Sequence, residues 1–442
     1  MKSLSLQPEK SRQMALTLSI CIVTCAVMIL SVLFFPKIRL GPLRMGSYWM
    51  VALIGALLLL ATGQVPLSTV VNAMVSNTAI NPIKILILFI SMTILSIYLD
   101  ELGFFRYLAN KTLKRAGKNQ VKLFFYLYLI VSVLTVVTSN DVIIRAFTPF
   151  ICYFARNAKI NAIPYLAAEF VAANTWSMAL IIGNPTNIYL GTSYGIGFVE
   201  YTQNMWLPTL GAGITAFIML YLISRKKLNK PIHGEAERVV IKDKLSLWVG
   251  IIHLAVCTVL LALSSYIGLE MWLVSAMAVL SLVFWCLVID LCRRHIPDEL
   301  VACAMRAPWQ LIPFVLSMFV MTIVLSEQGV TAAIGNFLGS QYAALKYGVT
   351  SFLTANVVNN IPMSVLFCSI MQSCDPGSLH DAVYATVVGS NIGAFLTPIG
   401  ALAGIMWSTI LNEHGLHFGY LRFLKIGIAV AVPTLFVALL LI

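Results

Sequence analysis

Charged residues are scarce in this chain. Its 442 residues include 29 Lys and Arg and 17 Asp and Glu, so that 10% are charged and 60% are apolar. A soluble domain usually has about 25% charged residues. This composition excludes a soluble globular enzyme, a disordered chain and a coiled coil. Apolar runs of about 16 to 22 residues, in place of short alternating strands, exclude a β-barrel. The predicted fold class is an all-α polytopic membrane protein.

Motifs for catalysis, ATP hydrolysis and metal binding are also missing. The nine Cys stand singly without a CxxC pair, and the sequence contains neither a GxxxxGK[ST] loop nor an HExxH helix. We therefore expect a protein that is not an enzyme, with no catalytic residues, no metal and no cofactor.

The basic residues are confined to short polar segments. Of the 29 Lys and Arg, 23 lie in six segments, which are 36–46, 104–122, 156–163, 225–244, 292–308 and 412–425. The alternate loops are nearly free of basic residues; these are 63–82, 196–204, 264–269, 326–344 and 374–382. Cytoplasmic loops of membrane proteins carry the excess of Lys and Arg. The net charge of +12 therefore indicates a multi-pass protein of the cell (cytoplasmic) membrane, not a nucleic-acid partner, and predicts both chain termini outside.

Ten apolar segments are predicted to cross the lipid bilayer. They are 14–35, 47–62, 82–100, 164–198, 204–224, 245–263, 270–291, 309–325, 382–411 and 420–442. Two further apolar stretches, 121–155 and 345–373, are interrupted in the middle by polar clusters. Spans 164–198 and 382–411 are also interrupted, by Gly183-Asn184-Pro185-Thr186-Asn187 and by Thr397-Pro398-Ile399-Gly400. Gly and Pro weaken or break a helix, so we expect two broken helices here.

An internal repeat relates the two halves of the chain. Residues 91–103 read SMTILSIYLDELG and residues 317–329 read SMFVMTIVLSEQG, with six of 13 positions identical. Five crossings separate these segments, so the copies face opposite ways. The sequence therefore predicts an inverted repeat, with 1–224 as the first half, 225–244 as a cytoplasmic linker and 245–442 as the second half. Each half has five spans and one interrupted hairpin. Many secondary transporters are built in this way.

The four interruptions bring small polar side chains to membrane depth. Non-helical backbone is tolerated there only when protein or water covers it. The predicted substrate and ion site consists of Ser139, Asn140, Asp141, Asn174, Thr175, Asn184, Thr186, Asn187, Asn359, Asn360, Ser390, Asn391 and Thr397. Hydrogen bonding between helices is the alternative role for any one of these clusters.

Few charged residues lie within the predicted spans. Arg145 follows Asp141 by four residues, on one helical face if the second limb of the hairpin starts at Asp141. Either the two residues neutralise each other, or Arg145 binds an anion, or Asp141 carries a proton or a cation. Glu169 is a possible proton carrier or a paired acid. Four acids at span ends, Asp100, Glu101, Asp290 and Glu327, are expected to be solvated.

The interruptions resemble a known family. The runs SNDVIIRAFTP (139–149), AANTWSMALIIGNPTNI (172–188), VNNIP (358–362) and GSNIGAFLTPIGALA (389–403) are similar to motifs of the ion-transporter superfamily. They resemble above all the arsenite/antimonite efflux permeases, with NhaD-type Na⁺/H⁺ antiporters and divalent-anion/Na⁺ symporters as relatives. The resemblance implies that the two interrupted stretches are re-entrant hairpins whose tips form the site with the broken helices. It further implies an elevator-type movement, a homodimer and, for an arsenical pump, a soluble ATPase partner.

Two features depart from the pattern of the arsenite permeases. Asn174 and Asn391 stand where those permeases tend to have Asp, and Arg145 stands where they have an apolar residue. Both changes make the site less acidic and favour an anionic substrate over a cation. We therefore predict a secondary transporter of a small inorganic ion or anion, similar to arsenite permeases and coupled to H⁺ or Na⁺. The alternatives are a carboxylate or anion symporter or exchanger, and a Na⁺/H⁺ antiporter. Thiolate ligation of arsenite by Cys152 and Cys368 is a further possibility.

Overall fold

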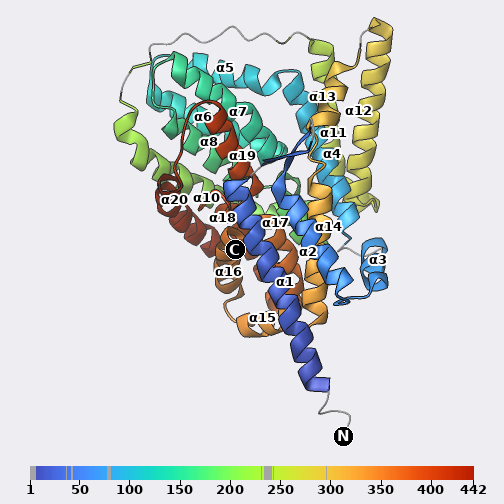
Figure 1. Ribbon diagram of the computed structural model, residues 1–442. Coiled ribbons are helices and arrows are strands. Elements are labelled where there is room, and N and C mark those ends of the chain that lie inside the picture. The colour runs from blue at the N-terminus through green and yellow to red at the C-terminus, as the bar shows by residue number, and fades with distance from the viewer. Residues whose placement is uncertain are drawn as a thin grey trace.

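The protein is a bundle of helices that run in opposite directions through most of its length (Figure 1). The computed structural model describes residues 6–35, 37–40, 43–76, 81–229, 231–232, 241, 243–294 and 296–442. Half of the predicted linker 225–244 therefore lies outside the described residues. Helices α5 and α13, which belong to two basic segments, lie at the top of Figure 1, whereas α3, α15 and the N-terminal end of α1 lie at the bottom.

The described residues of the first half form ten α-helices and a small β-hairpin. Its elements are α1 (Leu6–Phe34), β1 (Lys37–Leu40), β2 (Leu43–Gly46), α2 (Ser47–Ala61), α3 (Leu67–Val75), α4 (Pro82–Glu101), α5 (Phe104–Ala116), α6 (Gln120–Val137), α7 (Asn140–Asn157), α8 (Ile163–Trp176), the 3₁₀ turn η1 (Ile181–Gly183), α9 (Pro185–Ser193), α10 (Phe198–Ser224) and η2 (Arg225–Lys227). The two strands pair antiparallel, with Lys37 opposite Gly46. Apart from this hairpin, the predicted all-α class is confirmed for the described residues.

The second half contains another ten α-helices. They are α11 (Lys244–Ile267), α12 (Met271–Arg293), α13 (Asp298–Arg306), α14 (Leu311–Glu327), α15 (Val330–Leu338), α16 (Ala343–Val358), α17 (Asn360–Ile370), α18 (Pro376–Gly393), α19 (Leu402–Glu413) and α20 (Tyr420–Leu440), with the 3₁₀ turn η3 (Met371–Ser373) after α17. The element order of the second half follows that of the first from α4 and α14 onward.

Eight helices among the described residues are long and apolar enough to cross a membrane. They are Arg12–Ser31, Pro82–Glu101, Gln120–Val137, Phe198–Lys227, Lys244–Ile267, Met271–Arg293, Asp298–Glu327 and Tyr420–Leu440. Seven of them coincide with predicted spans, and the eighth is α6, the first limb of the interrupted stretch 121–155. Of the other three predicted spans, 47–62 is the shorter helix Ser47–Ala61, and 164–198 and 382–411 are each broken into two helices. The protein is thus a multi-pass membrane protein.

Helices of the two halves pack against each other in corresponding pairs. Helix α2 packs on α14, and α12 packs on α4. Helix α7 packs on α19, and α17 packs on α9. Within each half, α6 packs on α8 and α16 on α18, and α10 and α20 pack together between the halves. Each long helix of the interior therefore buries its small and apolar side chains against a helix from the other half or from the neighbouring hairpin.

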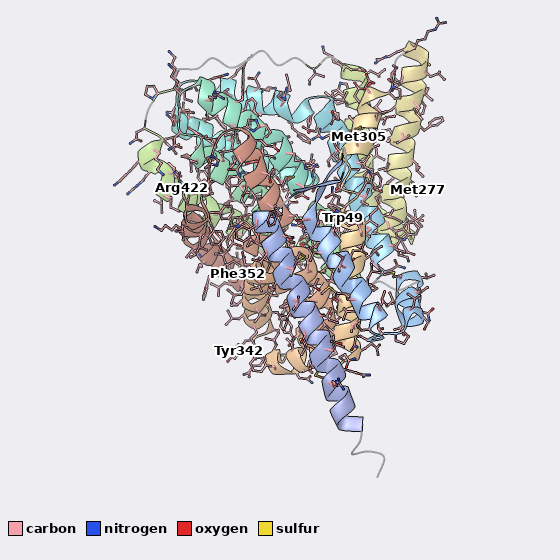
Figure 2. The ribbon with its side chains drawn as sticks, in the orientation of Figure 1. Trp49, Met277, Met305, Tyr342, Phe352 and Arg422 are labelled. Atoms are coloured by element: carbon pink, nitrogen blue, oxygen red, sulfur yellow. The ribbon has the colours of Figure 1, made fainter. Side chains whose placement is uncertain are left out.

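The outer surface of the bundle carries exposed apolar side chains, as a lipid-facing surface does. Met277, on α12, is 48% exposed and projects outward from the bundle in Figure 2. In α12, most of the apolar residues lie on this outer side. Exposed apolar side chains on so long a helix are stable in a hydrocarbon environment.

Two of the acids at span ends are not solvated, contrary to the prediction. Arg306 donates from NH2 to Oδ2 of Asp100 at 2.6 Å and from NH1 to Oε1 of Glu101. The side chain of Asp100 is only 12% exposed. Arg306 lies in α13, about 200 residues away in the sequence, so the pairing could not be read from local spacing. Glu327 is exposed, as expected.

Candidate functional site

Four helices begin at the interruptions predicted from the sequence. Helix α7 begins at Asn140, α9 at Pro185, α17 at Asn360 and α19 at Leu402. The first turn of a helix leaves backbone N–H groups without intrahelical partners, and the helix dipole makes this end positive. Four such ends gathered in the interior favour an anionic ligand, while carbonyls at the preceding helix ends can coordinate a cation.

Glycine is required at both broken helices because the backbone folds back on itself. A Cβ atom on Gly183 would lie 2.1 Å from the carbonyl oxygen of Ser177, and one on Gly400 would lie 2.4 Å from the carbonyl oxygen of Gly393. Any larger residue would push these segments apart. The two breaks thus share one local geometry.

An amide network joins the first hairpin to both broken helices. Asn140 Nδ2 donates to Asn174 Oδ1 at 3.1 Å. Asn184 Nδ2 donates to Asn391 Oδ1 at 3.0 Å, and Asn391 Nδ2 donates to Asn187 Oδ1 at 2.7 Å. Ser177 also donates to Asn391 Oδ1 at 3.0 Å. The network crosses from the first half to the second, because Asn391 lies in α18. Thr186 closes it by donating to Asn184 Oδ1 at 3.1 Å.

A second cluster lies at the tip between α16 and α17. Asn359 Nδ2 donates to the carbonyl of Ile399 at 3.0 Å, and the backbone N–H of Asn360 donates to the carbonyl of Gly400 at 3.0 Å. Asn356 accepts from Thr397 Oγ1 at 2.7 Å and donates to the carbonyl of Gly393 at 3.1 Å. Because Asn391 and Gly393 both lie in the last turn of α18, the two clusters adjoin through this helix end.

The backbone of Asn359 is strained. Its φ of 78° and ψ of 153° lie in a region that is almost confined to glycine. Such a conformation costs about 1–3 kcal/mol and persists only where surrounding contacts enforce it. Here the hydrogen bonds of the tip to the broken helix α18–α19 provide these contacts.

Three buried hydroxyls of the predicted site have no hydrogen-bond partner among the residues that the structure describes. They belong to Ser139, Thr175 and Ser390, each at most 3% exposed. A buried polar atom without a partner is costly and marks a place where a ligand, an ion or water belongs. All three are next to asparagines of the first network in the sequence.

Asp141 and Arg145 line a cavity of about 400 Å³ between the two halves. We call it the Arg145 cavity; it is lined by Gly46, Tyr48, Asp141, Arg145, Pro308, Gln310, Leu311, Leu402, Ile405, Met406, Thr409, Ile410 and Glu413. Its walls are α7 and α19 on one side and the first residues of α2 and α14 on the other. Gly46, Pro308 and Glu413 belong to three of the basic segments, so the cavity opens toward that end of the molecule.

Arg145 has no carboxylate partner among the described residues. Its Nε lies 2.7 Å from Met406 Sδ, and NH1 lies 3.5 Å from the carbonyl oxygen of Arg306. The ion pairs of the described residues do not include Asp141 with Arg145, although both side chains line the same cavity. The pair predicted as one alternative is therefore not in contact here.

Glu169 lies behind the wall of the cavity, and its side chain is fully buried. Thr148 of α7 donates to Oε1 at 2.8 Å, and Trp407 Nε1 of α19 donates to Oε2 at 3.2 Å. Thr148 is one turn from Arg145, and Trp407 follows Met406. Glu169 therefore connects α7, which carries Arg145, with α19, which carries Met406.

Sequence reasoning missed several residues of these arrangements. Ser177 and Asn356 lie three residues from Asn174 and Asn359, so helical spacing could have identified them. Tyr48 and Gln310 reach the Arg145 cavity from the starts of helices α2 and α14. No local signal in the sequence marks those two residues.

Comparison with known proteins places the chain in a family. Residues 44–389 match the family model described as "Citrate transporter". The chain belongs to the citrate transporter family. The match covers the seven predicted spans from 47–62 to 309–325, including the first broken helix, and both interrupted stretches, and it identifies the protein as a membrane transporter.

Individual proteins that are similar to this chain support the motif resemblance. The "Arsenical pump membrane protein" of Escherichia coli strain K12 is 27% identical over 417 residues, which are 90% of this chain and 93% of the relative. The protein of that name from Yersinia enterocolitica is 28% identical over 367 residues, 79% of this chain and 84% of the relative. The crystal structure of the YdaH transporter of Alcanivorax borkumensis covers 97% of each chain with a TM-score of 0.52 at 14% identity, a likeness of fold. The predicted resemblance to the ion-transporter superfamily is confirmed.

The amide network generates a stability prediction. Asn391→Ala removes an acceptor for Ser177 and Asn184 and a donor for Asn187, at about 1–3 kcal/mol for each buried partner left unsatisfied. Ser390→Ala, at the next position, removes a hydroxyl that has no protein partner and should change the stability by less than about 0.5 kcal/mol. Thermal unfolding in detergent and sodium-free buffer measures both. Equal Tm values for the two variants would contradict the network.

Proposed function

We propose that the chain is a secondary active transporter of a small anion that binds in the Arg145 cavity. The observation that carries this proposal is the Arg145 guanidinium, which faces the cavity without a carboxylate partner among the described residues. An arginine at membrane depth is costly unless a counter-charge or water compensates it. The planar guanidinium presents paired N–H donors, the geometry that suits carboxylates and oxyanions.

Neutral donors around the guanidinium support an anion site. Tyr48, Gln310 and Thr409 line the same cavity and offer hydroxyl and amide groups. The helix α7 that carries Arg145 begins at Asn140, so its positive end lies about one turn from the guanidinium. Asp141 and Glu413 bring negative charge to the cavity, which favours a small anion that contacts Arg145 over a large polyanion.

Two substrate classes are consistent with the relatives. The first is a metalloid oxyanion or other small inorganic anion, because the most similar relatives described above are named as arsenical pump membrane proteins. The second is a carboxylate, favoured by the match to the citrate transporter model and by the guanidinium itself. Neither Cys152 nor Cys368 lines the Arg145 cavity, so the proposal does not use thiolate ligation. With neutral Asn174 and Asn391, a Na⁺/H⁺ antiporter is the least favoured alternative.

We propose the inverted repeat and the domain division 1–224, 225–244 and 245–442 as the framework of transport. The corresponding helix pairs, α2 on α14 and α12 on α4, support it. So do the equivalent glycines Gly103 and Gly329, which both precede a helix with φ near 80° (78° and 76°). In this framework, α6–α7 and α16–α17 are re-entrant hairpins, and an elevator-type slide moves them with the broken helices. A homodimer and, for an arsenical substrate, a soluble ATPase partner complete the proposed assembly.

The proposed coupling ion is H⁺ or Na⁺, and groups near the helix breaks support either choice. The hydroxyls of Ser139, Thr175 and Ser390, together with carbonyls at the helix breaks, offer the oxygen ligands that Na⁺ needs. Glu169 offers a proton site. Protonation of Glu169 changes the hydrogen bonds to Thr148 and Trp407, and therefore the fit of α7 against α19 at Arg145.

Arg145 is the first residue to test. Arg145→Gln removes a charge-assisted contact worth about 1.5–3 kcal/mol, so the KM for the anion should rise by roughly 10- to 100-fold. Arg145→Lys should give a smaller defect, because a point ammonium replaces the planar fork. Initial transport rates in proteoliposomes, with arsenite and with citrate, measure both changes.

The double variant Asp141→Asn with Arg145→Gln is the matched control. If Arg145 serves the anion, the double variant stays as defective as Arg145→Gln. Recovery of transport would show that Arg145 only neutralises Asp141. Undiminished transport in Arg145→Gln would eliminate the anion role.

Glu169→Gln tests the proton site. The variant keeps the size of the side chain but cannot titrate, and its amide N–H faces one of the two donors. We expect the transport rate to fall by about tenfold, for a loss near 1.4 kcal/mol, and its pH dependence to flatten. Thr148→Ser keeps the hydroxyl donor and should keep the pH profile. A Glu169→Gln protein with the wild-type pH profile would exclude Glu169 as the proton carrier and leave Na⁺.

A further inference from the structure

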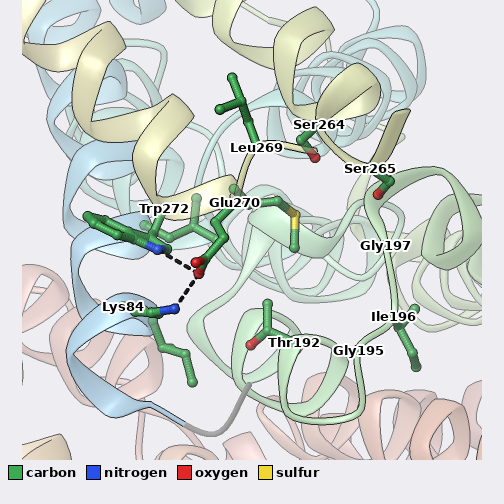
Figure 3. Close-up of a pocket in the computed structure, with 13 residues that line it drawn as sticks. Lys84, Thr192, Gly195, Ile196, Gly197, Ser264, Ser265, Leu269, Glu270 and Trp272 are labelled. Atoms are coloured by element: carbon green, nitrogen blue, oxygen red, sulfur yellow. Dashed lines mark hydrogen bonds and ion pairs between the residues drawn. The ribbon is translucent and has the colours of Figure 1, made fainter. Parts of the chain in front are cut away.

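A second cavity, of about 370 Å³, lies away from the basic segments. Figure 3 shows it between the first turns of α4, the turn after α9 and the junction of α11 with α12. Lys84, Glu270 and Trp272 form its polar wall, and Thr192, Gly195 and Ser265 face them. We call it the Lys84 cavity.

Two donors converge on one carboxylate oxygen in this cavity. Lys84 Nζ lies 2.5 Å from Glu270 Oε2, and Trp272 Nε1 donates to the same oxygen at 2.8 Å (Figure 3). The ammonium also lies 5.9 Å from the centre of the Trp272 ring. An ammonium and an indole N–H directed at one oxygen constitute an oxyanion site, and here the chain's own carboxylate occupies it.

The exposure of Glu270 allows its carboxylate to move away from Lys84 and Trp272. The Glu270 side chain is 49% exposed, whereas that of Lys84 is 21% exposed. Glu270 also precedes α12 at its N-cap position, outside the spanning helix, where the side chain can swing into solvent. The hydrogen bond from Lys84 holds the pKa of Glu270 below its usual value, so the carboxylate that occupies the site is charged.

The position of Lys84 is unusual for a basic residue. The segments 63–82, 196–204 and 264–269 around this cavity are nearly free of Lys and Arg, in keeping with the outer side of the membrane. A lysine at this end departs from the charge distribution of the rest of the chain. A binding role at this cavity explains why a lysine lies at this end of the molecule.

The Lys84 cavity corresponds to the Arg145 cavity at the starts of two helices. The start of α2 with Tyr48 corresponds to the start of α12 with Trp272, and the start of α14 with Gln310 corresponds to the start of α4 with Lys84. Between the two ends, a space of only about 20 Å³ lies among Ile85, Phe89, Tyr189 and Ile361. That space is too small for a hydrated ion, so the Lys84 cavity is closed off from the interior in this structure.

We propose that Lys84 and Trp272 form an outer binding site for a small anion, and that the Glu270 carboxylate occupies this site when no anion is bound. The substrate class is that of the Arg145 cavity, an oxyanion or carboxylate, and in this respect the inference rests on the proposed function. An anion that arrives at the outer end displaces Glu270 from Lys84. The displaced carboxylate then recaptures the two donors after the anion has left.

The test is protection of an engineered cysteine in the full-length protein. Ser265, which is exposed and lines the cavity, is replaced by Cys and labelled from outside with a membrane-impermeant maleimide. Citrate, arsenite and phosphate are added one at a time. At least one of them should slow the labelling. Adding Glu270→Gln should lower the half-protecting concentration by roughly 3- to 10-fold, because the competing charge is gone. Adding Lys84→Gln should raise it by at least about tenfold.

The same assay in an Arg145→Gln background separates this inference from the proposed function. If an anion still slows the labelling in this background, the outer site binds the anion independently of Arg145. This result would hold even if the chain transports another substrate. Trp272→Phe, which removes one N–H donor and keeps the packing, gives a milder second variant should Lys84→Gln fold poorly; it should raise the half-protecting concentration by a few fold. Labelling that none of the three anions slows, or protection unchanged in both Lys84→Gln and Trp272→Phe, would overturn the proposal.

Discussion

The arrangement depends on one constraint, which is that backbone polar groups inside a bilayer need partners within the protein. Two helices, α8–α9 and α18–α19, are interrupted, and two helix pairs, α6–α7 and α16–α17, meet at non-helical tips. Asparagine side chains supply the partners: Asn187 donates to the carbonyl of Ser177 at 2.8 Å, Asn359 to that of Ile399 at 3.0 Å and Asn356 to that of Gly393 at 3.1 Å. One of these amides, that of Asn187, also accepts from Asn391 Nδ2 at 2.7 Å across the two halves. The network that makes the breaks possible therefore also fixes the halves at a common centre.

The position of the proposed anion site follows from this centre. Because α7 starts at the first tip, Arg145 lies just over one turn from the network, and Thr148 lies one turn further. Helix α19 starts at the second break and brings Met406 and Trp407 to the same level. Glu169 bonds to Thr148 and Trp407, so the wall of the Arg145 cavity is held by a buried acid that joins a hairpin limb to a broken helix. In the proposed mechanism, a change at any of these positions alters both the anion site at Arg145 and the proton site at Glu169.

Most of the fold could be predicted from the sequence, because membrane spans and broken helices have strong local signals. Apolar runs gave the spans, and Gly183 and Gly400 marked breaks where the backbone approaches itself too closely for a Cβ atom. Ser139, Asn140, Asn184 and Asn391 stood out as polar residues in apolar runs. Contacts between distant helices could not be predicted. Arg306 with Asp100, Trp407 with Glu169, and Gln310 at the Arg145 cavity depend on helix packing, which leaves no mark in local spacing.

The central claim is that a small anion binds against Arg145 in a cavity open to the cytoplasm. Thr409, which lines this cavity, provides a direct measurement when it is replaced by Cys in a Cys292→Ser background, because Cys292 is exposed. A membrane-impermeant maleimide is applied to inside-out vesicles, with citrate or phosphate as the added anion. The account predicts that the residue is labelled from this side, that an anion slows the labelling, and that Arg145→Gln removes this protection. Labelling only from the opposite side, or protection that persists without Arg145, would contradict it.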